Sequence, residues 1–164
     1  MNDRTPPTGR NPWLVLAGFL TLSIAVLSLG GAVTAPAIEV WYQGLAKPPW
    51  TPPDWLFGPV WTALYLAMAV AAWLVWRRWG WQGARCALIL YLVQLGLNFL
   101  WSPAFFGLRD PLLGMVVIAP LWLAVAATTV AFFRKQTFAG SLFVPYLAWA
   151  SYAVGLNAAI LALN

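Results

Sequence analysis

The side chains best suited to contact a small molecule are amides and aromatic rings, and they recur at helical spacing. Gln94, Asn98, Trp101 and Phe105 follow one another at intervals of three or four residues. At about 100° per residue, these intervals place all four on one face of a helix. Amides that face lipid are costly, so Gln94 and Asn98 should face the interior of a helix bundle. The stripe predicts either hydrogen bonds between helices or one wall of a mixed polar and aromatic cavity.

A second group of residues adds another candidate wall. Trp61 and Tyr65 are four residues apart, as are Trp149 and Ala153, so each pair shares a helix face. Trp149 lies well inside its apolar stretch, where anchoring at a membrane surface does not explain it. A tryptophan in that position needs a partner for its indole N–H or a ligand to stack on.

Acid–base, metal and redox groups are scarce. The chain has no histidine and one cysteine, Cys86, which excludes Ser-His-Asp triads, His-ligated metals and an intrachain disulfide. Carboxylates occur only at the ends of apolar stretches: Asp3, Glu39, Asp54 and Asp110. We expect Asp54, together with Thr51, and Asp110 to cap helices. We therefore predict no metal site and no cofactor, and expect that any reaction would use the chemistry of the ligand.

The elements that must position these residues are membrane helices. Hydrophobic residues make up 62% of the 164 residues and charged residues only 8%, against about 25% charged residues in soluble domains. Five uncharged stretches reach the roughly 20 residues that a helix needs to cross a bilayer. They lack the alternation of barrel strands. We predict an all-α fold, one bundle of five transmembrane helices in a lipid bilayer, at about residues 13–35, 55–76, 86–106, 112–133 and 138–164.

The longest connection, residues 39–54, combines four prolines with large aromatic residues. Proline stiffens the backbone and removes N–H donors, while Trp41, Tyr42 and Trp50 supply flat surfaces. One interpretation is an aromatic belt at the depth of the lipid headgroups. The other is a lid over a pocket at the outer end of the bundle. Such a pocket would suit a large, flat, mostly apolar ligand with a few polar groups.

The positions of lysine and arginine predict the topology. Seven of the nine lie on one side of the membrane: Arg4, Arg10, Arg77, Arg78, Arg85, Arg134 and Lys135. Lys47 and Arg109 lie on the other. The excess predicts a cytoplasmic N-terminus and an external C-terminus, and leaves a bacterial inner or outer membrane open. The net charge of +5 thus reflects topology, and no nucleic-acid partner is predicted. Four tryptophans beside Arg77 are expected to form an interfacial belt: Trp73, Trp76, Trp79 and Trp81.

Several motifs resemble those of a known family. They are Trp41-Tyr42, LAKPPWTPP at 45–53, GPVWTALY at 58–65, QLGLNFLWSPAFFG at 94–107, AATTVA at 126–131, PYLAW at 145–149 and Leu156-Asn157. In order and spacing they are similar to the TspO/MBR family, the tryptophan-rich sensory proteins and translocator proteins (peripheral-type benzodiazepine receptors). The resemblance spans about residues 41–157.

The resemblance implies a five-helix membrane protein, usually a homodimer, that binds porphyrins such as protoporphyrin IX and, in some members, benzodiazepine-type drugs. It places the ligand-binding positions of the family on Tyr42, Pro52, Trp61, Tyr65, Asn98, Trp101, Trp149 and Ala153. Trp101 stands where some members carry phenylalanine. The last helix lacks the tyrosine and arginine of the cholesterol motif in animal translocator proteins, so we do not expect a cholesterol carrier.

Three functions are compatible with these residues. The favoured one is a membrane receptor for porphyrins and related flat apolar ligands, with a sensory or regulatory role in tetrapyrrole metabolism or stress. The first alternative is a light- and oxygen-dependent porphyrin-degrading enzyme in which Trp61 and Trp149 would be catalytic, as the resemblance implies. The second alternative is a tetrapyrrole or lipid transporter. The absence of an inverted repeat and of an intramembrane charge counts against it.

Overall fold

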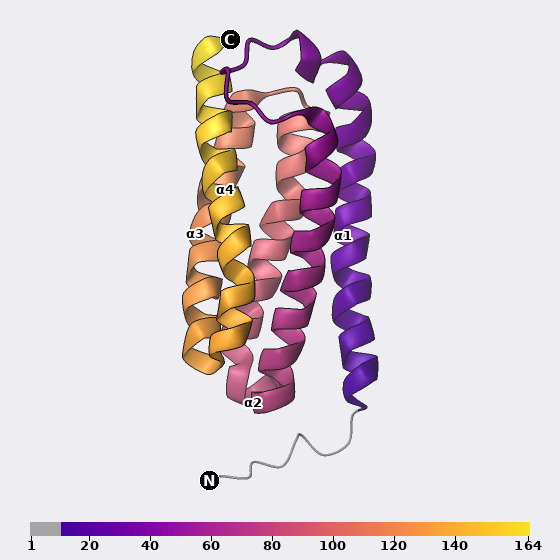
Figure 1. The fold of residues 1–164 in the computed structure, drawn as a ribbon, viewed down its shortest axis with the longest axis vertical. Coiled ribbons are helices and arrows are strands. Elements are labelled where there is room, and N and C mark those ends of the chain that lie inside the picture. Colours follow the sequence, from indigo (N-terminus) through magenta and orange to yellow (C-terminus); the bar gives the residue numbers. More distant parts are fainter. Residues whose placement is uncertain (1–10) are drawn as a thin grey trace.

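The computed structural model describes residues 11–164, and over this range its regular secondary structure is entirely helical, which confirms the all-α prediction. Four helices lie along a common direction (Figure 1): α1 (Pro12–Val40), α2 (Phe57–Ser102), α3 (Pro111–Lys135) and α4 (Thr137–Leu163). Shorter pieces connect them: 3-10 turns at Tyr42–Gly44 and Asp54–Leu56, and a π-helix at Pro103–Gly107. The predicted charges of Asp3, Arg4 and Arg10 lie outside the described residues.

Each of the four helices is long and apolar enough to cross a membrane. Two of them begin with a side-chain cap followed by proline. The Asn11 side-chain oxygen accepts a hydrogen bond from the Trp13 N–H at 3.0 Å, and Asp110 accepts from the N–H groups of Leu112 and Leu113 at 2.9 and 3.0 Å. These bonds satisfy N–H groups that have no partner inside the helix. The capping role predicted for Asp110 is confirmed.

Five separate helices are not observed within residues 11–164, because the expected loop between residues 76 and 86 stays helical. The 46-residue α2 departs from helical geometry at Gly80 (φ 65°, ψ 179°) and Ala84 (φ −123°, ψ 16°). Figure 1 shows α2 doubling back there into two arms; we call residues 57–79 the first arm and residues 85–102 the second arm. A φ of 65° is accessible to glycine without a Cβ clash. The turn is therefore tight enough to interrupt α2 without ending it.

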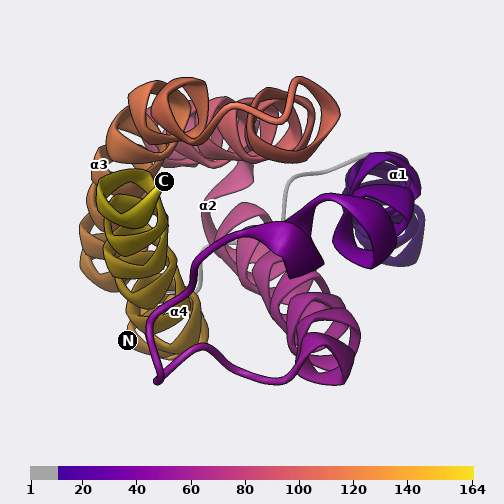
Figure 2. The ribbon, with the colours of Figure 1, turned by 90° about the horizontal axis from the view of Figure 1, so that it is seen from above.

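The core lies among α2, α3 and α4, and α1 packs against α2 at the edge (Figure 2). Only three of the 29 residues of α1 are buried: Ser23, Gly30 and Ala37. Near the turn of α2, the belt prediction is wrong for Trp73 and Trp76, which are buried in the core. The Trp73 indole N–H donates to the carbonyl of Pro12 at 2.9 Å. The Trp73 ring therefore joins α1 to the bundle.

Candidate ligand-binding site

A chain of hydrogen bonds joins the two arms of α2 to α4. The Tyr65 hydroxyl donates to the Asn98 Oδ1 at 2.6 Å, and the Asn98 Nδ2 donates to the Tyr146 hydroxyl at 2.6 Å. That hydroxyl donates in turn to the Gln94 Oε1 at 3.1 Å. Gln94 and Asn98 are buried, which confirms that both amides face the interior. Each bond satisfies a polar group that lipid could not, so the network holds the two arms of α2 and α4 in register with one another.

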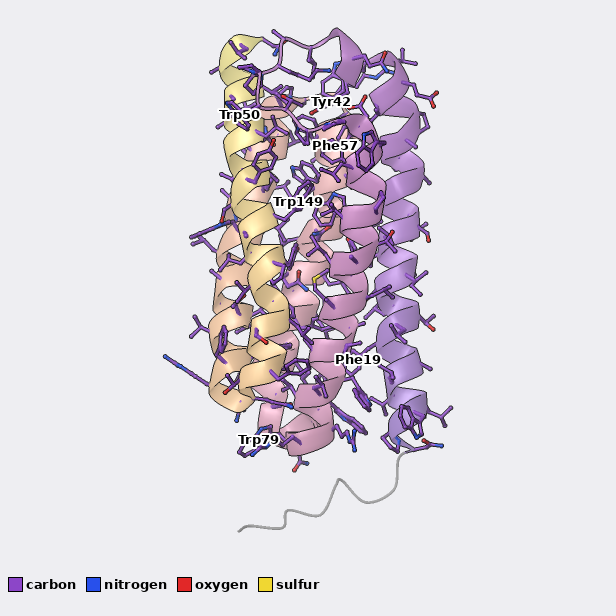
Figure 3. All side chains as sticks on the ribbon, in the orientation of Figure 1. Phe19, Tyr42, Trp50, Phe57, Trp79 and Trp149 are labelled. Atoms are coloured by element: carbon purple, nitrogen blue, oxygen red, sulfur yellow. The ribbon has the colours of Figure 1, made fainter. Side chains whose placement is uncertain are left out.

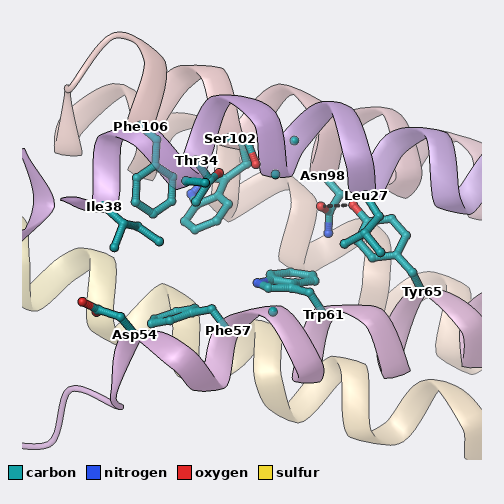
Figure 4. Close-up of a pocket in the computed structure, with 15 residues that line it drawn as sticks. Leu27, Thr34, Ile38, Asp54, Phe57, Trp61, Tyr65, Asn98, Ser102 and Phe106 are labelled. Atoms are coloured by element: carbon teal, nitrogen blue, oxygen red, sulfur yellow. Dashed lines mark hydrogen bonds between the residues drawn. The ribbon is translucent and has the colours of Figure 1, made fainter. Parts of the chain in front are cut away.

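A cavity of about 210 Å³ lies between α1 and the two arms of α2 (Figure 4). We call it the α1–α2 cavity. Four of the eight predicted site residues line it: Trp61, Tyr65, Asn98 and Trp101. Helix α1 supplies mostly small or aliphatic residues to the opposite wall, among them Gly30. A Cβ at Gly30 would lie 3.1 Å from the Ser102 Oγ, so this glycine lets α1 approach the second arm closely.

The other four predicted residues lie near this cavity without lining it. Tyr42 and Ala153 border a small void of about 20 Å³ beneath residues 41–56. Pro52 and Trp149 line a shallower hollow between the first arm and α4. Phe57 connects the two regions, because it lines the α1–α2 cavity and its ring lies 6.0 Å from that of Trp149. Figure 3 shows Tyr42, Phe57 and Trp149 toward the same end of the bundle.

Residues 41–56, which we call the lid segment, run from α1 across to α4 and back to α2 (Figure 2). Helix α4 holds this segment at two points. The Asn164 side chain accepts from the Ala46 N–H and donates to the Ala46 carbonyl, both at 3.0 Å. The Tyr152 hydroxyl donates to the Trp50 carbonyl at 2.7 Å. These three bonds fasten the segment over the end of the bundle that contains the site.

Tyr42 of the lid segment is deeply buried, with 2% of its surface exposed. Its hydroxyl has no hydrogen-bond partner within residues 11–164. Burial raises the pKa of Tyr42 to about 12, and the carboxylate of Asp54 adds to the effect. Lys47 makes two contacts with Tyr42. Its Nζ donates a hydrogen bond to the Tyr42 carbonyl at 2.8 Å and lies 4.4 Å from the centre of the Tyr42 ring. The ring thus closes the lid end of the bundle.

Asp54 lies at the candidate site, whereas its place in the sequence predicts a helix cap. The Thr51 N–H and hydroxyl both donate to the Pro48 carbonyl, at 3.0 and 2.7 Å, so Thr51 closes a turn and caps no helix. The Asp54 carboxylate caps none either, and the predicted capping box is wrong. Asp54 lines the α1–α2 cavity instead. Its position directly after a proline-rich segment matches both roles, and only the backbone path distinguishes them.

Thr34 and Ser102 also line this cavity and were not singled out from the sequence. The signal for Thr34 is its spacing: it lies four residues after Gly30, on the same face of the helix. Within residues 11–164 no group of three His, Cys, Asp or Glu side chains could hold a metal ion. The arrangement provides aromatic surfaces, hydroxyls, an amide and one carboxylate. Such a set binds and orients a ligand through stacking and hydrogen bonds.

Comparison with known proteins identifies the family. A sequence model of the TspO/MBR family matches residues 19–163. The chain is 44% identical to the tryptophan-rich protein TspO of Archaeoglobus fulgidus over 86% of this chain and 93% of that protein. It is 43% identical to the tryptophan-rich sensory protein of Cereibacter sphaeroides (93% and 92%) and 39% identical to the human translocator protein (89% and 88%). Since residues 11–164 contain four helices able to cross a membrane, the chain is an integral membrane protein, and it belongs to the TspO/MBR family.

Proposed function

We propose that this protein is a membrane receptor that binds porphyrins such as protoporphyrin IX, and related flat apolar ligands, and has a sensory or regulatory role in tetrapyrrole metabolism or stress. The observation that carries the proposal is the α1–α2 cavity, where Trp61 and Trp101 lie beside the Tyr65–Asn98 hydrogen bond. Indole rings stack on flat conjugated ligands, and a few polar groups fix their orientation. The names of the relatives, sensory protein and translocator protein, support a receptor-type role.

The dimensions of the cavity suit partial enclosure of such a ligand. Its volume of about 210 Å³ is below the roughly 300–1,000 Å³ of common ligand pockets. A tetrapyrrole would therefore lie with one edge inside the cavity and the rest along α1. The side of the ligand that faces lipid would be apolar.

The porphyrin-degrading alternative needs Trp61 and Trp149 to act on one ligand. Trp61 lines the α1–α2 cavity, whereas Trp149 lines the hollow between the first arm and α4. Phe57, 6.0 Å from Trp149, lies between the two sites. One ring could reach both indoles only if Phe57 moved. The geometry therefore supports binding better than degradation.

A titration with protoporphyrin IX tests the proposal. The purified protein in detergent is titrated in the dark, following quenching of tryptophan fluorescence and the porphyrin absorption band, and is then illuminated in air. We expect saturable quenching that weakens at least severalfold in Trp61→Phe and is unchanged in Trp81→Phe, a control at the opposite end of the bundle. Absence of quenching and of a spectral shift would refute porphyrin binding. Light-dependent loss of the band that requires both Trp61 and Trp149 would support the degrading enzyme instead.

We also propose the topology and assembly of the receptor. The two arms of α2 would each cross the membrane, so that the chain crosses five times, with its N-terminus in the cytoplasm and its C-terminus outside. The Tyr65–Asn98 bond supports this arrangement because it joins the middle of one arm to the other. By the family resemblance the protein would act as a homodimer. Crosslinking in native membranes tests for the dimer, and the absence of a dimer band would argue against it.

A further inference from the structure

Within residues 11–164, Asp54 is the one charged residue that lines the α1–α2 cavity. Figure 4 shows it at the lid end, below Ile38 and beside Phe57, while Tyr65 marks the opposite end. The other lining residues are apolar or carry neutral polar groups. A ligand that fills the cavity along Trp61 therefore ends close to a carboxylate.

No group within residues 11–164 neutralises this carboxylate. It takes part in no ion pair or side-chain hydrogen bond there, and it caps no helix. Lys47, the basic residue of the lid segment, is engaged with the carbonyl and ring of Tyr42 and does not line the cavity. Arg109, in the connection before α3, does not line it either. The negative charge of Asp54 is thus available to a ligand.

Two hydroxyl groups, those of Thr34 and Ser102, could bind neutral polar atoms of a ligand. Thr34 and Ser102 also line the cavity, on the side of α1 (Figure 4), and neither hydroxyl is used in a hydrogen bond within the described chain. A hydroxyl both donates and accepts, so this pair accommodates a neutral polar group without selecting its charge. Selection by charge is left to Asp54.

We infer that the α1–α2 cavity selects among flat apolar ligands by charge, favouring those with a cationic group at the lid end over anionic ligands of the same shape. The inference rests on the proposed function, since it concerns the ligand class of the same site. A fixed carboxylate attracts a cation, repels an anion and leaves a neutral group nearly unaffected. Because Asp54 is exposed, solvent screening limits each step to about threefold to fivefold in affinity.

Three porphyrins with one ring and different side-chain charge test this inference. They are protoporphyrin IX, with two carboxylates, its neutral dimethyl ester, and a diamide whose side chains end in primary amines. Each is titrated in an uncharged detergent against the wild-type protein, Asp54→Asn and Glu39→Gln. Glu39 is a matched control, because it is an exposed carboxylate near the end of α1 that does not line the cavity.

For the wild-type protein we expect the amine to bind most tightly and the acid most weakly, with about a tenfold spread. In Asp54→Asn the acid should gain affinity and the amine should lose affinity relative to the ester, so that the spread disappears, whereas Glu39→Gln should preserve the spread. Equal affinities in the wild-type protein, tighter binding of the acid, or a spread that survives in Asp54→Asn would overturn the inference alone. If none of the three porphyrins binds, the proposed function fails instead. A thermal melt of Asp54→Asn that matches wild type shows that the variant is folded.

Discussion

Tyr42 and Asn98 are both buried polar residues, but they differ in whether their side chains have hydrogen-bond partners. Asn98 donates to the Tyr146 hydroxyl and accepts from that of Tyr65, both at 2.6 Å. The Tyr42 hydroxyl is equally removed from solvent and has no partner within residues 11–164. A buried polar group without a partner costs free energy. The bonds of Asn98 therefore stabilise the bundle, whereas the unpaired hydroxyl of Tyr42 lowers the free energy of unfolding.

Replacing Tyr42 by phenylalanine should preserve or raise the stability of the protein, by about 1 kcal/mol, because the hydroxyl loses water on folding and gains no bond. Folding raises the Tyr42 pKa from its ordinary value of 10.0 to about 12. Between these values the unfolded chain releases a proton that the folded chain retains, so stability is full below pH 10 and falls as the pH rises toward 12. Thermal melts in detergent at about pH 8 and about pH 11 should show a smaller alkaline loss for Tyr42→Phe.

Tyr152→Phe is the matched control for this prediction. Its hydroxyl donates to the Trp50 carbonyl at 2.7 Å, so the same change removes a hydrogen bond instead of an unsatisfied group. We expect a small decrease in melting temperature at both pH values. A large destabilisation by Tyr42→Phe would show that its hydroxyl has a partner in the membrane-embedded protein.

At the scale of elements, close approach of helices depends on a few glycines. Gly140, in the first turns of α4, faces the end of α3, and a Cβ there would lie 2.8 Å from the Cα of Phe133. Backbone cannot move away as a flexible side chain does. Gly18 of α1 lies in open space, with nothing within 4 Å of its Cβ position. The two glycines thus differ only in what surrounds them.

Gly140→Ala should destabilise the protein by about 1–3 kcal/mol, because the added methyl group forces α3 and α4 apart. Gly18→Ala should be neutral or stabilising by a few tenths of a kcal/mol, since alanine favours a helix. Melting temperatures in one detergent measure both changes. If the two variants melt together, close contact between α3 and α4 at Phe133 is not required for the fold.

The lid segment is an element held by side chains of α4. The paired bonds between Asn164 and Ala46, both 3.0 Å, lie at the exposed end of that helix. We expect Asn164→Ala to release this part of the segment, because its backbone groups would then bond to water. Hydrogen exchange over residues 45–50 should speed up severalfold, with no change over α3. Ser141→Ala, at the other end of α4, is the control, and equal exchange in both variants would show that the bonds do not hold the segment.

At the scale of the whole molecule, the course of α2 decides the topology. Its two arms lie side by side in Figure 1, and the Gln94 Nε2 of the second arm lies 3.7 Å from the Met68 Sδ of the first. If both arms cross the membrane, the turn near Gly80 and the end of α4 must lie on opposite sides. The excess of basic residues near that turn predicts that it lies in the cytoplasm.

Reporters attached near Gly80 and after Asn164 should therefore give opposite signals. We expect a cytoplasmic signal from a reporter inserted in the turn and an external one after Asn164. The measurement uses a pair of enzyme reporters that are active on opposite sides of the membrane, each placed at both positions. The same side for both positions would exclude five crossings, and an exchange of sides would reverse the orientation.

Much of the fold followed from composition and periodicity. Long apolar runs predicted membrane helices, and the spacing of Gln94 and Asn98 predicted their burial. The turn at Gly80 was misjudged, because hydropathy marks where a chain leaves lipid and does not show whether the backbone stops being helical. The eight predicted site residues are neighbours at one end of the bundle, but they border three separate hollows. Helical spacing shows which residues share one face of a helix, but it does not show which other helix that face packs against.

The sequence by itself determined that this protein lies in a lipid bilayer, that it is helical and to which family it belongs, because these depend on residue type and on spacing along one helix. Only the tertiary structure decided which groups lack partners. Asp54 matches a helix cap in sequence, yet Thr51 bonds to Pro48 and leaves that carboxylate at the mouth of the α1–α2 cavity. Hydrogen bonds and cavities arise between segments distant along the chain, so their partners are settled only when α1, α2 and α4 have packed together.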